Sequence, residues 1–471
     1  MTTPQQPIQP CGDEYASAKA SSDSGRSNKH PGPAPNKLLD DENELAINTT
    51  IERGEQKYSR LGWKRLTICM IVEAVALGSL SIPSAFATLG LVPGILITVG
   101  LGLIAIYTSY LIGLVKLKFS HVAHYADAVG LIWGRFGKEL AGFMFAALLI
   151  LSTGSHALTG SIALSTIADT GTCNVVWSIV SAIVLFFLAL PPSFAEFAIL
   201  GYIDFASIVL AIGVTIIATG IDATDSVAGM SSVDWQLWAP QGTSYYEAFL
   251  SITNIVFAYS FAMCQFSFMD EMHTPKDYIK SVWALGLIEI TIYTITGSLV
   301  YVFVGSGVES PALLSASKVV SRIAFGIAIP VIFISGSINT TVVGRYIINR
   351  AFPNSELRYT NTRRGWMVWI GLVLAITIVA WVIAEAIPVF NALLGLISSL
   401  FISGFTLYFP PLFWFMLLKE GSWRSSWRNI GLSVLNAVIF LIGLLVLGSG
   451  TYASIQDIIN QTGESNKPFG C

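Results

Sequence analysis

Four ionisable side chains lie inside stretches of sequence that are otherwise almost entirely apolar. Ionisable groups are costly in a hydrocarbon environment, so each is by default a functional hypothesis, here as a carrier of protons. A carboxyl group can carry protons only when its pKa lies near the working pH, which a medium of low dielectric can arrange. The alternative is a buried, neutral, hydrogen-bonded structural group. The four candidates are Glu73, His156, Asp204 and Glu289.

Glu73 ranks first because a predicted helix break follows it after just over one turn. Pro83 has no N–H to donate and clashes with the preceding turn, while Gly78 offers backbone freedom. The hydroxyl groups of Ser79 and Ser81 can bond the carbonyl groups that a break frees. An unwound segment would expose amide groups and a helix N-terminus that suit a carboxylate. A simple proline kink is the alternative.

Two further segments carry polar groups at membrane depth. Residues 254–266 combine aromatic and small polar side chains, which suits a ligand pocket, although no Pro or Gly signals a break there. Ser337, Thr340 and Thr341 share one helical face, where their hydroxyl groups could ligate a cation or a water. In both segments the alternative is hydrogen bonding that joins helices or caps carbonyl groups.

The elements that must position these residues are membrane helices. The chain is 53% hydrophobic and 12% charged, with a mean hydropathy of +0.66, whereas a soluble chain carries roughly 25% charged residues. A span needs about 20 mostly apolar residues. The sequence therefore predicts an all-α polytopic membrane protein with eleven transmembrane helices, centred on 65–89, 92–115, 138–166, 174–192, 196–219, 246–269, 280–304, 318–348, 366–386, 389–418 and 428–452.

The basic residues segregate between alternate loops, which predicts a cytoplasmic N-terminus and an extracytoplasmic C-terminus. One set of loops receives only Lys318, Arg322 and Lys467. The other set receives Arg53, Lys57, Arg60, Lys64, Arg65, Lys116, Lys118, Arg135, Lys138, Lys276, Lys280, Arg345, Arg350, Arg358, Arg363, Arg364, Lys419, Arg424 and Arg428.

Three regions follow from this topology. Residues 1–57 are polar and are predicted to form a disordered cytoplasmic tail. Residues 58–458 are predicted to form the transmembrane domain, and residues 459–471 a short extracytoplasmic tail. Asn460, in the sequon Asn460-Gln461-Thr462, is predicted to be accessible to glycosylation, whereas Asn48 is not. The tail lysines suggest acceptors for a ubiquitin ligase and its adaptor, the alternative being a solvated tether. They are Lys19, Lys29 and Lys37.

Composition also excludes several classes. A net charge of −3 and a pI of about 6.0 exclude a broadly basic nucleic-acid binder. The five cysteines form no metal or redox motif, so neither a metal nor a cofactor is expected. Whether Cys173 and Cys471 pair is left open. No apolar signal-peptide core precedes the first span, so that span is expected to direct insertion.

Several motifs resemble one known family. The segments EAVALGSLSIPSAFATLG, HYADAVGLIWGRFG and FAYSFAMCQFSFMDEMHTPKDY are similar to the amino acid/auxin permease (AAAP) family. The segments LGWKRLT, PPSFAEFAILGYIDF, SPALLSA and WVIAEAIPVF resemble its fungal neutral amino acid permeases, of the N-system type. The resemblance covers about residues 58–458.

The resemblance implies a five-plus-five inverted repeat (APC/LeuT-like) within eleven spans, with the first and sixth helices broken at the substrate site. Its carboxylate-binding backbone falls on Gly78, Ser79 and Leu80, and its cation site near Ala76, Thr340 and Thr341. Sodium-coupled animal relatives carry an Asn and a Gly-Ser-Gly run at the first break, which this chain lacks, and that favours protons over sodium. Its side-chain pocket falls near Phe257, Ala258, Tyr259, Ser260 and Phe261.

The leading hypothesis is a secondary active transporter at the plasma membrane that imports neutral aliphatic and aromatic amino acids with protons. No charged residue occurs in the two pocket segments to pair with a charged substrate side chain. The alternatives are an amino acid sensor that signals through its tail, and an amino acid exporter of the vacuolar membrane. An integral membrane enzyme lacks a visible nucleophile–base pair, and a channel lacks a repeated filter or ring of like charges.

Overall fold

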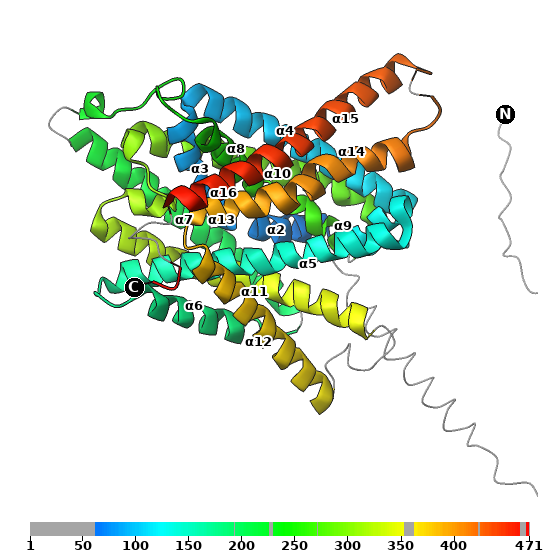
Figure 1. Ribbon diagram of the computed structural model, residues 1–471, viewed down its shortest axis with the longest axis horizontal. Helices are drawn as coiled ribbons and strands as arrows, with labels where there is room; N and C mark the ends of the chain where they lie inside the picture. The colour runs from blue at the N-terminus through cyan, green and yellow to red at the C-terminus, as the bar shows by residue number, and fades with distance from the viewer. Residues whose placement is uncertain are drawn as a thin grey trace, which may run out of the picture. The chain divides into compact units, whose positions relative to one another are not determined.

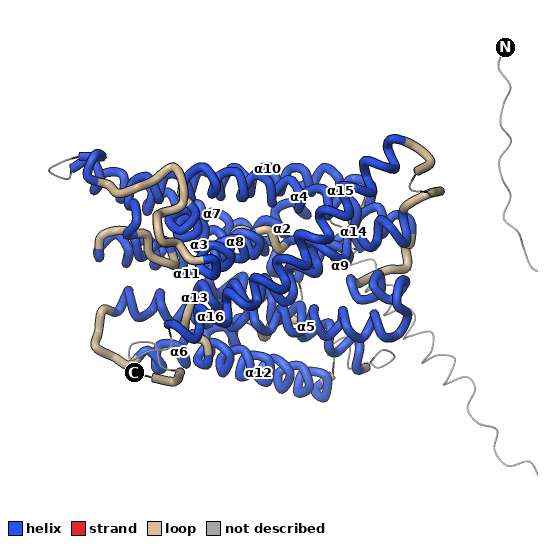
Figure 2. The backbone as a smooth tube through the Cα atoms, turned by 45° about the horizontal axis from the view of Figure 1, so that its top comes forward, coloured by secondary structure: helices blue, strands red, loops and turns tan. Residues whose placement is uncertain are grey.

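The computed structural model describes residues 62–192, 194–225, 229–270, 272–352, 362–422, 424–461 and 468–470. Regular structure in these ranges is helical, and no β-strand occurs in them (Figures 1 and 2). The predicted tail 1–57, with its three lysines and Asn48, lies outside the described residues. Asn460 is exposed at the end of α16, and Thr462 of its sequon lies outside the described residues.

The first six predicted spans correspond to nine helical segments. The first span is divided into two helices and the sixth into three short segments. In chain order the segments are α2 (Trp63–Ala74), α3 (Ala76–Leu89), α4 (Leu91–Lys118), α5 (Tyr125–Ala168), α6 (Asn174–Leu188), α7 (Phe194–Asp225), α8 (Tyr245–Ala258), η2 (Phe261–Cys264) and α9 (Gln265–Asp270).

The remaining five predicted spans begin after the short helix η3 (Pro275–Asp277). Between α10 and α11 lies a loop that contains the short helix η5. The segments are α10 (Tyr278–Val304), η5 (Ala312–Ser315), α11 (Lys318–Ala351), α12 (Arg363–Ala386), α13 (Phe390–Ile397), η7 (Ser398–Tyr408), α14 (Phe409–Phe413), η8 (Trp414–Leu418), α15 (Trp427–Leu445), η9 (Val446–Gly450) and α16 (Thr451–Gln461).

Nine of these helical stretches, counted over the described ranges, are long and apolar enough to cross a membrane. The other two predicted spans are the pair α2 and α3, each shorter than a span, and α6, which has 15 residues. The polytopic helical architecture is therefore confirmed, while the count of eleven stays a prediction. The third predicted span begins within α5, after a kink at which Gly134 adopts a φ of 59°.

Small residues bring α4 and α10 close together. A Cβ atom added at Gly102 would lie 2.4 Å from Ile290, and one added at Gly286 would lie 2.2 Å from Ile106. Such close backbone approach is the usual packing mode where lipid removes the hydrophobic driving force between helices. This contact fixes the position of α10, which carries Glu289.

Helix α11 packs against α5 and against α7. Polar side chains join them to backbone carbonyl groups of α11. Ser207 Oγ lies 2.5 Å from the oxygen of Ile327, and His156 Nδ1 lies 2.8 Å from that of Ile332. The second of these bonds holds one of the four ionisable candidates, His156, against α11.

Lys318 and Arg322, the cations that the loop count assigned to the sparsely charged side, both form ion pairs with Asp169. Lys318 Nζ lies 2.8 Å from the carboxylate, and Arg322 pairs with its other oxygen. The hydrogen bond from Lys318, together with the charge of Arg322, lowers the pKa of Asp169. The link ties the end of α5 to the start of α11.

The packing of α4 on α10 generates a stability prediction. A Cβ atom at Gly113 would lie 1.9 Å from the ring of Tyr278, whose hydroxyl is anchored to the carbonyl of Tyr110 at 2.8 Å. Because the ring cannot move away freely, Gly113→Ala should destabilise the fold by about 1–3 kcal/mol. The measurement is the thermal midpoint in detergent. Gly100→Ala, on the same helix with no atom within 4 Å, is the matched control and should leave the midpoint unchanged.

Candidate functional site

Two helices are interrupted in the middle of the bundle. Helix α2 ends at Ala74, Val75 has a φ of −78° and a ψ of −10°, and α3 begins directly afterwards. Helix α8 ends at Ala258 and is followed by Tyr259, at φ −98° and ψ 42°, and Ser260, at φ −85° and ψ 3°. The second interruption arises without Pro or Gly, so no residue type in the sequence signals it directly.

The first interruption lies three residues before the predicted position. Gly78, Ser79 and Leu80 belong to α3 instead of to an unwound segment, and Pro83 is accommodated within the same helix. Ser79 Oγ donates to the carbonyl of Val75 at 2.7 Å, and Ser81 Oγ donates to that of Gly78 at 2.9 Å. Both are the usual bonds of helical serines to carbonyl groups three or four residues back, so the prediction that they bond carbonyl groups freed by a break stays a prediction.

Gly78 packs directly against the end of α8. A Cβ atom at Gly78 would lie 2.6 Å from Ala258 Cα and 2.9 Å from Ala258 Cβ. The two interrupted helices therefore touch where the sequence predicted an open cradle for a carboxylate. Packing alone is enough to require glycine here, so the residue type carries no separate evidence for ligand contact.

The hydroxyl group of Tyr293 joins the two interruptions. This side chain of α10 is fully buried, and its Oη lies 3.0 Å from the carbonyl oxygen of Ala74 and 3.0 Å from that of Ala258. Tyr259 packs on it at a ring-centroid distance of 5.2 Å and donates to the carbonyl of Thr98 at 2.9 Å. Tyrosines from two helices thus surround the point where α2 and α8 end.

The predicted side-chain pocket is buried but is partly used for packing. Phe257 to Phe261 are all buried. Tyr259 is committed to α4 and α10 by its hydroxyl bond and ring contact, so it does not face a cavity in this arrangement.

Glu289 lies one turn before Tyr293 on α10, on the same face of the helix. It is 0% exposed, and neither carboxyl oxygen has a hydrogen-bond partner among the described residues. An ionised carboxylate in this position would be an uncompensated buried charge, which costs several kcal/mol. The arrangement therefore favours the neutral carboxyl group.

The other three ionisable candidates differ in their surroundings. Asp204 is buried and accepts long bonds of 3.3 Å from Ser335 Oγ at each carboxyl oxygen. His156 is buried against α11 through Ile332, as described above. Glu73 belongs to α2, but its side chain lies outside the described residues.

The predicted cation-site hydroxyl groups bond to protein groups away from the first span. Thr340 Oγ1 lies 3.2 Å from the carbonyl of Gly336 and 3.1 Å from Thr153 Oγ1 of α5. Thr341 Oγ1 lies 3.0 Å from the carbonyl of Ser337 and 3.5 Å from that of Ala189. Such bonds are what the helix-joining alternative expects, and the cation site stays a prediction. The side chain of Ala76, the third member, lies outside the described residues.

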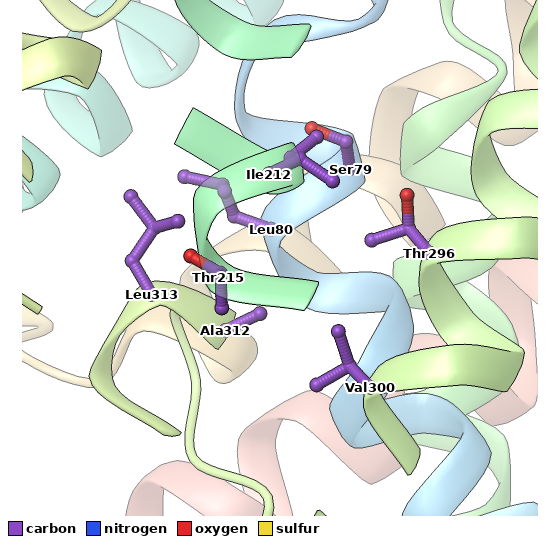
Figure 3. A pocket seen from close by; sticks show the side chains of 8 residues that line it. All are labelled: Ser79, Leu80, Ile212, Thr215, Thr296, Val300, Ala312 and Leu313. Atoms are coloured by element: carbon purple, nitrogen blue, oxygen red, sulfur yellow. The ribbon is translucent and has the colours of Figure 1, made fainter. Parts of the chain in front are cut away.

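A small hollow with room for about one water molecule adjoins α3. Figure 3 shows side chains converging on it from α3, α7, α10 and η5. Ligand pockets usually enclose about 300–1,000 Å³, so binding an amino acid as large as leucine here requires the surrounding elements to move apart. The lining residues are Ser79, Leu80, Ile212, Thr215, Thr296, Val300, Ala312 and Leu313.

Lys116 has a role that charge counting missed. It is only 5% exposed, and its ammonium group reaches Asp270 at 2.5 Å and the carbonyl groups of Ser120 and Val122 at 3.0 and 2.6 Å. The ammonium group thus ties the end of α4 and the following loop to α9. A lysine within the last turn of an apolar helix was the available signal, but its partner is 154 residues away.

Two solved transporters share this fold. The MHP1 transporter of the nucleobase-cation-symport-1 family, in a closed conformation with bromovinylhydantoin bound, aligns with a TM-score of 0.53 and 14% identity over 88% of this chain and 96% of that one. MhsT in complex with L-phenylalanine aligns with a TM-score of 0.50 and 14% identity over 83% and 99%. The chain therefore has the fold of a multi-pass membrane transporter.

Sequence comparison identifies the family. The profile described as "Transmembrane amino acid transporter protein" matches residues 59–456. The N amino acid transport system protein of Neurospora crassa is 57% identical over 424 residues, which cover 89% of this chain and 90% of that relative. Amino acid permease 8 of Arabidopsis thaliana is 22% identical over 90% of this chain and 96% of its own length. The chain belongs to the transmembrane amino acid transporter family, and the resemblance found in its motifs is confirmed.

The contact at Gly78 generates a prediction that separates packing from ligand contact. Gly78→Ala places a methyl group against the backbone of Ala258, so it should lower the thermal midpoint of purified protein as well as reduce transport. Gly213→Ala, on α7 with no atom within 4 Å, is the control and should change neither. If Gly78→Ala leaves the thermal midpoint unchanged but abolishes substrate binding, glycine is needed for contact with the ligand and not for packing.

Proposed function

We propose that the protein imports neutral amino acids together with protons. The substrate binds where α2–α3 and α8–η2 are interrupted, with its carboxylate beside Gly78, Ser79 and Leu80 and its amino group at the end of α8. Several features support a neutral substrate. No charged residue occurs in the pocket segments Gly78–Leu80 and Phe257–Phe261, and aliphatic groups line the adjoining hollow. The fungal relative is named for N amino acid transport, and MhsT was solved with L-phenylalanine.

The single observation that supports the proton is the environment of Glu289. Its carboxyl group is fully buried without a hydrogen-bond partner among the described residues, one turn from the tyrosine that bonds both interruptions. Because an ionised form is costly in this arrangement, closure of the bundle around the site is linked to protonation of Glu289. A conformational change that buries and exposes this group would move a proton with the substrate.

For topology we propose eleven spans, of which the first ten form two inverted five-helix repeats. The protein would lie in the plasma membrane with its N-terminus in the cytoplasm. The disulfide at Cys173 supports an extracytoplasmic loop between α5 and α6, because disulfides persist in oxidising compartments. Cys471 lies outside the described residues, so its pairing with Cys173 stays open. The exposed Asn460 fits a glycosylated C-terminal end.

The proton proposal predicts the behaviour of one variant. Glu289→Gln keeps the size of the side chain and removes its titration, so the variant should lose the pH-dependent accumulation of leucine against a gradient. Counterflow exchange of leucine should persist, because it needs binding and conformational change but no net proton movement. The measurement is radiolabelled uptake by proteoliposomes with and without an imposed proton gradient.

Matched variants decide among the other carboxyl groups. Asp204→Asn and Glu73→Gln should retain pH-dependent accumulation if Glu289 carries the proton. Retained pH dependence in Glu289→Gln, with loss in Asp204→Asn, would move the role to Asp204 and its partner Ser335. Uptake that requires sodium at fixed pH would contradict proton coupling altogether.

A further inference from the structure

Tyr293 holds both interrupted helices through a single hydroxyl group. Its Oη is equidistant, at 3.0 Å, from the last carbonyl of α2 at Ala74 and the last carbonyl of α8 at Ala258. The final carbonyl groups of a helix have no partner within the helix, so they need donors from elsewhere. Both residues are buried, at 3% and 0% exposure, so water is not a ready substitute.

The single hydroxyl group of Tyr293 cannot satisfy both carbonyl acceptors. A phenol has one O–H, so it can complete one good hydrogen bond or share its proton between the two carbonyl groups of Ala74 and Ala258. Two helix C-termini converge there, and each carries a partial negative charge that favours a cation. An ammonium group supplies three N–H donors and a positive charge, which is what the phenol lacks.

The phenol of Tyr293 and an ammonium group cannot both fit beside the two carbonyl groups in this arrangement. Gly78 and Ala258 are in contact on one side, and the ring of Tyr259 covers Tyr293 on another. A group that approaches both carbonyl oxygens must therefore separate the interruptions and displace the phenol.

We propose that the hydroxyl group of Tyr293 competes with the α-ammonium group of the substrate for the carbonyl groups of Ala74 and Ala258. Tyr293 is a positioning residue that closes the empty site. It weakens amino acid binding because its hydrogen bond to the two carbonyl groups must be broken before the substrate can bind. The proposal rests on the proposed function only in requiring an amino acid as ligand. It holds for any α-amino acid, whatever its side chain.

The test compares two ligands on purified full-length protein. Leucine carries the ammonium group, and 4-methylpentanoate has the same side chain and carboxylate without it. Tyr293→Phe keeps the ring and removes the donor, so leucine should bind about three- to tenfold more tightly, the equivalent of one net hydrogen bond. 4-Methylpentanoate should bind no more tightly, because it does not use the carbonyl groups that become free.

The control is Tyr301→Phe, which removes a buried phenol from the same helix two turns later. That hydroxyl accepts a bond from the amide of Gln236 at 2.9 Å and does not touch either interruption. Its leucine affinity should stay within about twofold of the wild-type value. Weaker leucine binding in Tyr293→Phe, or an unchanged ratio between the two ligands, would make Tyr293 a purely structural tie and overturn the proposal.

A second measurement covers the case in which Tyr293→Phe does not fold. 3-Fluorotyrosine at position 293 retains the hydroxyl group, and its ¹⁹F resonance should shift when leucine is added but not when 4-methylpentanoate is added. Identical responses to the two ligands would overturn displacement by the ammonium group. If the wild-type protein binds lysine or glutamate instead of leucine, the proposed substrate class fails, and the same comparison with that amino acid and its des-amino analogue still tests Tyr293.

Discussion

The contact between the two interrupted helices is the constraint on which the rest of the site depends. Gly78 leaves room for the backbone of Ala258 and for nothing larger, so the ends of α2 and α8 meet with their last carbonyl groups close together. Two converging helix C-termini need donors, and Tyr293 provides one hydroxyl for both. The small size of the adjoining hollow and the burial of Tyr259 accompany the same close approach. Any ligand that enters between the interruptions has to change this contact first.

Two buried ionisable side chains, Lys116 and Glu289, have different surroundings. Lys116 has three acceptors around its ammonium group, so the buried charge is compensated and the residue joins α4 to α9. Glu289 has no hydrogen-bond partner in the described part of the chain, although it is fully buried. A compensated charge stabilises one arrangement, whereas an uncompensated carboxyl group makes that arrangement depend on a proton. This contrast is why Glu289, rather than Asp204 with its serine partner, is the favoured carrier.

Much of the architecture could be predicted from local sequence. Apolar stretches of span length located the helices. The place of the first interruption was wrong by three residues, because a contact with α8 and not the local Gly and Pro determines where the chain bends. The interruption at Tyr259 had no local signal at all.

The site could be predicted less well for the same reason. Thr340 and Thr341 share a face, but only the folded structure shows that their hydroxyl groups meet Thr153 of α5 and the carbonyl group of Ala189, directly after α6. Tyr293 was not predicted as a site residue, because its acceptor on α2 lies 219 residues away and only the folded bundle brings them together. Glu289 could be nominated from its burial in an apolar segment, but its lack of partners is a property of the packed structure.

The central claim is that movement of the substrate is coupled to protons, and measuring both fluxes in the same vesicles tests it most directly. Proteoliposomes that hold the purified protein and a trapped pH indicator, in sodium-free buffer and with potassium and valinomycin clamping the potential, should acidify inside when leucine is added outside. The rate should follow leucine uptake in a fixed ratio. Leucine uptake without any change in internal pH, or uptake that appears only when sodium is supplied, would contradict the account.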